Sequence, residues 1–311
     1  MNQFKIFFKV LLCLFFLSKA KATTLDLSTS KSDQTQSSSL GLDGDFNESI
    51  MNWSASVSQS KTKTTNPTSG ETITDTTRDY SAGFGFSNPN QIYGNLSLSY
   101  SATPEENILN LGPTASIGYT YKFEPKTDAD TFKPAIGLNL KYGQQNYIQT
   151  FTPQQRISIK AGPKPTSGNS QIIQRLAALA IKIKPVDWFQ LKLTSIRYSY
   201  SKDVAGFLQN IDSQPVQPTN TSGLSNALSG FYESTFDIAL IFYLFDDWEL
   251  DLTNSSSKLS SDQSTANSNE IEIGYDINNS WKISIATLSS KSSNEGSEAA
   301  TNNSLYVSYS F

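Results

Sequence analysis

The chain has 311 residues, with 24 basic and 28 acidic side chains, a formal net charge of −4, one Cys and no His. The lack of His excludes Ser-His-Asp, Cys-His and His-ligated zinc chemistry, so an enzyme would have to work with carboxylates, Lys or Tyr. An acidic balance also argues against nucleic acid as a partner, because its binding needs a basic surface.

The first 22 residues have the pattern of a secretory signal. Two lysines precede an apolar run over residues 10–17, and Ala20-Lys21-Ala22 has the small-x-small spacing of a cleavage site. The run is too short to cross a bilayer as a helix, which takes about 20 apolar residues. We therefore expect a signal peptide over 1–22 and a single mature domain over 23–311. Removing the signal takes away four lysines and no acid, so the mature chain has 20 basic and 28 acidic residues, a net charge of −8.

Short segments of alternating apolar and polar residues recur between clusters of Asn, Asp, Ser, Pro and Gly. In 270–277, for example, Ile, Ile, Tyr and Ile alternate with Glu, Glu, Gly and Asp. Alternation of this kind predicts half-buried β-strands. In chain order, we predict strands at 24–33, 36–46, 49–60, 75–87, 91–101, 114–123, 132–146, 171–184, 188–201, 231–245, 248–260, 268–277, 281–290 and 302–311.

This count of about fourteen leaves twelve or sixteen open. The first hairpin is rich in Ser and Thr with few apolar residues, and 156–160 would also fit an extended loop hairpin. Residues 171–183 fit a helix by their three- and four-residue apolar spacing, although the Pro-Val-Asp turn that follows favours a strand. An even number of strands returns the two ends of a barrel to the same side.

Alternation alone fits either a soluble sandwich or a barrel in lipid, and two features favour the barrel. Trp188, Trp248 and Trp281 each open a strand after a short turn. We expect these three at one level, as a girdle at a membrane interface; independently packed core tryptophans are the alternative. The connections at the other strand ends are long and polar, at 61–72, 147–170, 202–230 and 291–302.

The last residues carry the sharpest motif. Leu305, Val307, Tyr309 and Phe311 alternate with polar residues and Tyr306, and Phe311 ends the chain. Here the sequence resembles bacterial outer-membrane β-barrel proteins, whose last strand alternates and ends in an aromatic residue that the barrel-assembly machinery reads. The resemblance implies an all-β, transmembrane, antiparallel up-and-down barrel in the outer membrane, with lipids and that machinery as partners. It implies that Tyr309 and Phe311 form the assembly signal, and it implies no particular solute.

If the apolar face meets lipid, the alternate residues line the interior. The first five strands place mostly small polar residues there, and the later strands sort their charges by sign, lysines before carboxylates. The predicted pore-lining residues are Lys141, Lys182, Lys192, Asp237, Glu249, Asp251, Glu270 and Glu272. Such charge segregation would bias which solutes pass through a water-filled pore, or neighbouring charges would merely neutralise one another.

We therefore expect a porin that passes small hydrophilic solutes or ions by passive diffusion. The alternative is a structural or surface-interaction barrel that acts through its extracellular loops, above all 202–230, and a secreted soluble sandwich or adhesin is a third hypothesis. Paired carboxylates such as Glu249 and Asp251 also suit Ca²⁺ binding or acid-base catalysis, but spacing of two follows from any acidic lumen face. We predict no enzyme, metal or cofactor.

Overall fold

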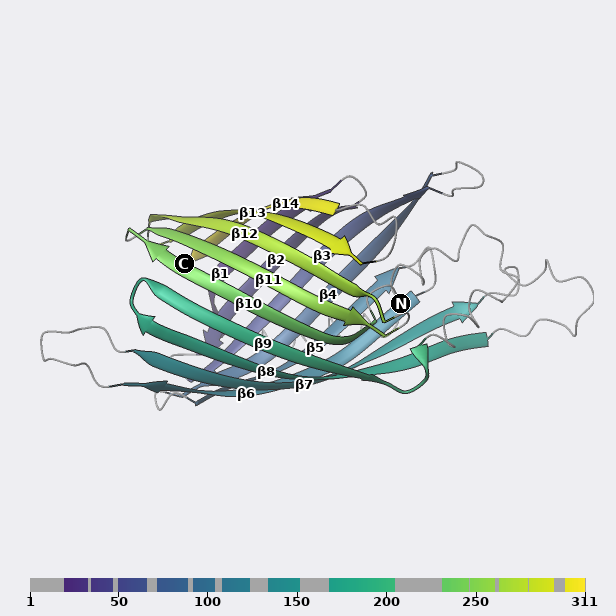
Figure 1. The fold of residues 1–311 in the computed structure, drawn as a ribbon, viewed down its shortest axis with the longest axis horizontal. Helices are drawn as coiled ribbons and strands as arrows, with labels where there is room; N and C mark the ends of the chain where they lie inside the picture. Colours follow the sequence, from purple (N-terminus) through teal and green to yellow (C-terminus); the bar gives the residue numbers. More distant parts are fainter. Residues whose placement is uncertain are drawn as a thin grey trace, which may run out of the picture.

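The structure, a computed structural model, describes residues 20–32, 35–46, 50–65, 72–88, 92–103, 108–123, 134–151, 168–204, 231–245, 247–260, 263–278, 280–293 and 300–310. These form fourteen strands (Figure 1). They are β1 (Ala20–Lys31), β2 (Thr35–Phe46), β3 (Met51–Thr65), β4 (Thr72–Ser87), β5 (Ile92–Thr103), β6 (Ile108–Lys122), β7 (Ala135–Phe151), β8 (Gly168–Val186), β9 (Phe189–Tyr200), β10 (Tyr232–Leu244), β11 (Trp248–Leu259), β12 (Thr265–Asn278), β13 (Trp281–Ser292) and β14 (Ala300–Ser310).

Every strand pairs antiparallel with the strands before and after it in the chain, and β1 pairs with β14 to close a barrel. Closure leaves no strand edge with unpaired backbone groups. The prediction of an all-β, fourteen-strand, up-and-down barrel is confirmed. The helical alternative for 171–183 is wrong, because β8 pairs along its length with β7 and β9.

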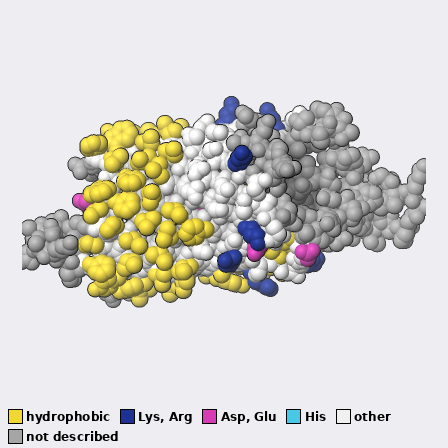
Figure 2. Space-filling view, in the orientation of Figure 1, with side chains coloured by type: hydrophobic (Ala, Val, Ile, Leu, Met, Phe, Trp, Pro, Cys, Tyr) yellow, Lys and Arg dark blue, Asp and Glu magenta, His cyan; other side chains and the backbone are white. Residues whose placement is uncertain are grey.

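The register decides which side chains face outward. Residues opposite each other on neighbouring strands point to the same side of the wall, and successive residues alternate. On β12, Ile271 is opposite Leu252 and Thr287, whereas the next residue, Glu272, is opposite Asp251. The Ile271 row faces outward, and apolar side chains cover the outer face over one half of the barrel (Figure 2).

The two ends of the barrel differ in their connections. At one end, the turn end, only residues 187–188, 245–247 and 279–280 link β8 to β9, β10 to β11 and β12 to β13. The longest connection, 201–231, lies at the opposite end, the loop end, where most of the predicted long loops at 147–170 and 202–230 fall outside the described residues. The sorting has exceptions, since the connection 123–134 at the turn end is long and 32–34 at the loop end is short.

Two of the predicted loops are partly strand. The pairing of β3 with β4 continues to Thr65↔Thr72, and β13 runs to Ser292, so the loops expected at 61–72 and 291–302 are shorter than predicted. Thr favours extended backbone, and the ladder therefore continues past the apolar part of each strand. Within the described residues, no helix is long and apolar enough to span a membrane.

β1 begins at Ala20 and so overlaps the end of the predicted signal peptide, whose residues 1–19 fall outside the described ranges. The register between β1 and β2 shifts between Ala22 and Thr24. The pairs that close the barrel begin at Thr24↔Ser310. Cleavage after Ala22, which stays a prediction, would leave these closing pairs intact.

Candidate functional site

The register places all eight predicted pore-lining residues on the inward face of the wall. The lysines come from β7, β8 and β9, and the carboxylates from β10, β11 and β12. Lys182 is directly opposite Lys192, and Asp251 is directly opposite Glu272. Like charges in directly opposite positions repel, so both pairs cost the barrel stability unless an ion or solute of opposite charge lies near them.

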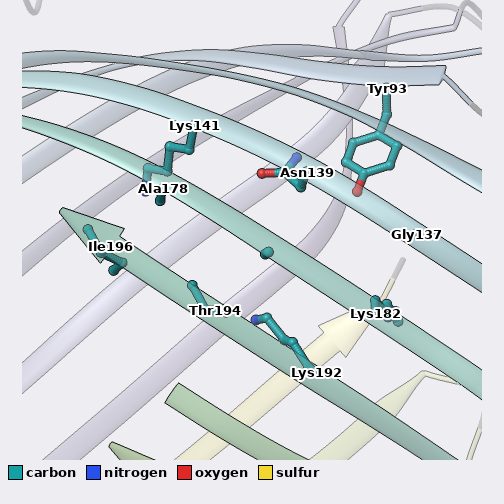
Figure 3. A pocket seen from close by; sticks show the side chains of 10 residues that line it. Tyr93, Gly137, Asn139, Lys141, Ala178, Lys182, Lys192, Thr194 and Ile196 are labelled. Carbon is teal, nitrogen blue, oxygen red and sulfur yellow. The ribbon is translucent and has the colours of Figure 1, made fainter. Parts of the chain in front are cut away.

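A cavity of about 370 Å³ lies against the basic part of the inner wall (Figure 3). Lys141, Lys182 and Lys192 line it together with polar groups of Asn139 and Thr194. None of these three lysines forms a salt bridge within the described part of the chain. The cavity thus presents three ammonium groups and hydrogen-bonding side chains to whatever enters, an arrangement that suits an anionic or strongly polar group.

Tyr93 of β5 reaches this cavity across β6, and Gly118 makes the reach feasible (Figure 3). A Cβ atom at Gly118 would lie 2.2 Å from Cζ of Tyr93. Only glycine therefore leaves room for the phenol ring to lie against the wall at this point. Tyr93 was not predicted from the sequence, because a lone aromatic residue on a mostly polar inward face does not indicate which neighbouring strand its side chain crosses.

Within the described residues, the acidic part of the inner wall contains one ion pair. Lys282 Nζ lies 3.1 Å from Glu249 Oε2, and its side chain passes over Gly274 on the strand between them, where an added Cβ would meet Lys282 Cε at 3.0 Å. Asp251 accepts a hydrogen bond of 3.0 Å from Thr253 Oγ1. Glu270 is close enough to Asp251 for like-charge repulsion.

Neutralisation between neighbouring charges therefore applies to Glu249 alone among the eight predicted residues, as far as the described ranges extend. Its partner, Lys282, was not among them. Further inward carboxylates, Asp26 and Asp43 among them, were also missed. Asp26 accepts a 2.5 Å hydrogen bond from Ser308 across the closing seam, a neighbour 282 positions away that no local pattern reveals. Among the described residues, no group of acidic side chains is arranged to hold a metal ion.

Toward the loop end, the basic part of the inner wall meets a buried aromatic cluster. The Phe231 ring packs edge-on against Tyr147 and Tyr200, with centroids 5.2 and 5.0 Å away. Gln174 donates a hydrogen bond of 3.0 Å to the Tyr200 hydroxyl, which donates one of 2.6 Å to the Tyr232 carbonyl. Phe231, the residue that follows the segment 205–230, is thus fixed on the inward side of the barrel.

The three predicted girdle tryptophans, Trp188, Trp248 and Trp281, lie exposed at the turn end. The Trp248 ring packs against Tyr275 at a tilt, with centroids 4.7 Å apart, and the Trp281 ring packs against Tyr309 in the same way at 4.6 Å. Tyr309, predicted as part of the assembly signal, is therefore also a packing partner in the folded barrel. Phe311 lies outside the described residues.

Between these tryptophans and the level of Lys258, the described outer face carries no charged side chain. On β11, every outward residue from Trp248 to Ser256 is uncharged, and the next outward residue is Lys258. The other strands follow the same rule: no described outward-facing position between the turn end and the level of Lys258 is charged. Ionised side chains at these levels all point into the barrel.

No protein-family model matches the chain, and no curated protein sequence matches it. Among solved structures, it is similar to the CymD monoaromatic hydrocarbon channel, with a TM-score of 0.49 at 10% identity over 96% of this chain and 90% of that chain. It is also similar to the Pseudomonas putida toluene transporter TodX, with a TM-score of 0.47 at 10% identity and the same coverage. The KdgM porin gives 0.43 at 9% identity over 93% and 99%. Likeness at this level says nothing of a shared solute.

Proposed function

We propose that this protein is an outer-membrane pore that passes small hydrophilic solutes or ions by passive diffusion. The observation that carries the proposal is the partition of charge between the two faces of one wall. Between the turn end and Lys258, the described outward face is uncharged and is apolar toward the turn end, whereas lysines and carboxylates face inward, the lysines around a cavity.

A lipid environment best accounts for the lack of charge on the outer face. A water-soluble barrel of this size would gain solubility from charges on its outer wall. In a bilayer, a lysine or arginine on the lipid face costs about 2–4 kcal/mol at the midplane. Exposed tryptophans at the turn end fit an interface, where the apolar ring and the polar N–H are both satisfied.

Passage of solutes is the activity that best accounts for the charges on the inner face. The like-charge pairs Lys182/Lys192 and Asp251/Glu272 destabilise an empty wall, which favours a water-filled interior that holds counter-ions near them. Because the basic and acidic parts lie on different strands, they produce a field across the lumen that orients and selects charged solutes. We propose passage in place of catalysis, since the chain has no His and the described carboxylates form no metal site.

Conductance in planar bilayers tests the proposal. The folded wild-type protein should give steady channels, and two inward triple variants should shift ion preference in opposite directions. The inner basic triple, Lys141→Gln/Lys182→Gln/Lys192→Gln, should favour cations, and Asp251→Asn/Glu270→Gln/Glu272→Gln should favour anions. No conductance at any voltage from a barrel that runs anomalously on gels before boiling would refute the pore.

We also propose that Tyr309 and Phe311 act in assembly. Deleting Phe311 should lower the amount of heat-resistant barrel recovered from cells far more than it lowers refolding of the purified chain. Equal losses in both measurements would make Phe311 a packing residue. Trp281→Ala, which removes the ring that packs against Tyr309, is the matched control and should affect both measurements alike.

A further inference from the structure

The outward face changes abruptly at one level toward the loop end, where basic residues appear. Lys258 and Lys291 lie ten positions after Trp248 and Trp281 on their strands, and Arg197 lies at the same end of β9. Beyond the loop-end edge of the apolar band, basic side chains gather on the outer surface (Figure 2). We name six of the exposed basic residues at this end the outer basic ring: Lys31, Lys61, Arg78, Arg175, Arg197 and Lys291.

The spacing between the tryptophans and this ring matches a membrane. At about 3.3 Å per residue and a strand tilt of about 40°, ten positions correspond to roughly 25 Å of height, the height of the lipid-facing band of an outer-membrane barrel. If the tryptophan of one of these strands lies at one membrane boundary, the lysine ten positions later on the same strand therefore lies at the other boundary. Between them, the outer wall is apolar near the turn end and carries uncharged Ser, Thr and Asn nearer the ring.

The ring is almost purely basic. Among the described residues at this level, the outward acid is Glu233, which sits at a bulge of β10 and pairs with Lys258 at 2.8 Å. No salt bridge in the described ranges involves the six members of the ring. Lys61 and Arg78 lie on adjacent strands, as do Arg175 and Arg197, so the members repel one another in the isolated protein.

We infer that the outer basic ring binds the phosphate groups of anionic lipids in the leaflet at the loop end. A lipid leaflet supplies several negative charges at one height beside the uncharged outer wall, which a soluble anion or a protein loop would not. Basic residues beside an anionic leaflet contribute about 1 kcal/mol each. Arg members also donate paired hydrogen bonds to phosphate oxygens. The inference rests on the membrane placement proposed above.

A pair of triple variants tests this inference. The outer triple, Lys61→Gln/Arg175→Gln/Lys291→Gln, and the inner basic triple remove the same charge from opposite faces. Each full-length protein is refolded in phosphatidylcholine vesicles and then titrated with phosphatidylglycerol, and native mass spectrometry reports the apparent affinity for phosphatidylglycerol relative to phosphatidylcholine. The outer triple should lower this preference on the order of 100-fold, and the inner triple should leave it unchanged.

The outcomes separate the two proposals. Wild-type protein that folds in phosphatidylcholine but binds both lipids equally would overturn the basic-ring inference alone, as would equal losses in the two triples. Failure of the wild type to form a heat-resistant barrel in phosphatidylcholine would overturn the membrane placement and this inference with it. In conductance, the outer triple should keep the ion preference of the wild type.

Discussion

Neighbouring residues of one strand face two different surroundings in this barrel. On β12, Ile271 and Ile273 point outward among apolar side chains, while Glu270 and Glu272 point inward beside Asp251. The outer face accepts no described charge until the level of the outer basic ring, whereas the inner face tolerates like charges in opposite positions. This difference is what the proposed membrane placement requires, namely a low-dielectric exterior and an interior in which charge can be solvated.

The largest expected effect comes from adding charge to one face or the other. Ile271→Lys should lower the free energy of unfolding in lipid vesicles by about 2–4 kcal/mol, because it places an ammonium group in the lipid-facing band. Glu272→Lys, one residue along, should leave stability unchanged or raised, since it converts a repulsive pair with Asp251 into an attractive one. Denaturant titrations of both variants provide the measurement, and equal effects would contradict a lipid-facing outer wall.

A smaller effect is expected where the inner face depends on shape. Gly118→Val would force Tyr93 out of its place, because a Cβ there lies 2.2 Å from the ring, and overpacking of this kind costs about 1–3 kcal/mol. Gly137→Ala is the matched control, since its Cβ would be 3.3 Å from Thr120 Oγ1 and requires only a slight shift. Adding Tyr93→Ala to Gly118→Val should recover part of the loss, and strictly additive losses would show that the two residues do not interact.

The smallest effect is expected from single ion pairs. The inner pair Lys282–Glu249 and the outer pair Lys258–Glu233 are both partly exposed, at about a third and 40% of the side-chain surface. Double-mutant cycles with Lys→Met and Glu→Gln should give less than about 1 kcal/mol of coupling for the inner pair and only weak coupling for the outer pair. Molar salt should reduce both couplings. A coupling several times larger on the inner side would mean that the lumen near Glu249 is dry.

Much of the fold follows from local pattern. Alternation in 270–277 predicts both that β12 is a strand and which of its faces is apolar, because the direction of a side chain repeats every two residues. The same reasoning placed Lys182 and Asp251 on the polar face. It failed where polar strands extend beyond the apolar band, as in β3 up to Thr65, because no hydrophobic signal marks their ends.

The site was predictable only in part. Eight lysines and carboxylates of the inner wall were identified one by one, but Lys282 was missed, because its pairing with Glu249 across Gly274 depends on the register of three strands. Tyr93 joins the cavity only because β6 offers a glycine at the level it crosses. Asp26 meets Ser308 because the barrel closes. Each of these contacts joins residues whose distance along the chain carries no information about their distance in space.

By itself, the sequence determined the strand class, an approximate number of strands, which face of each strand is apolar and which is polar, and the absence of histidine chemistry, since each is a property of composition or period. Only the tertiary structure decided which charges share a level. A closed barrel has one register around its whole circumference, and that register brings the basic residues of distant strands into a single outer ring and places Lys182 opposite Lys192. Periodicity fixes the direction in which a side chain points, and the register fixes its height.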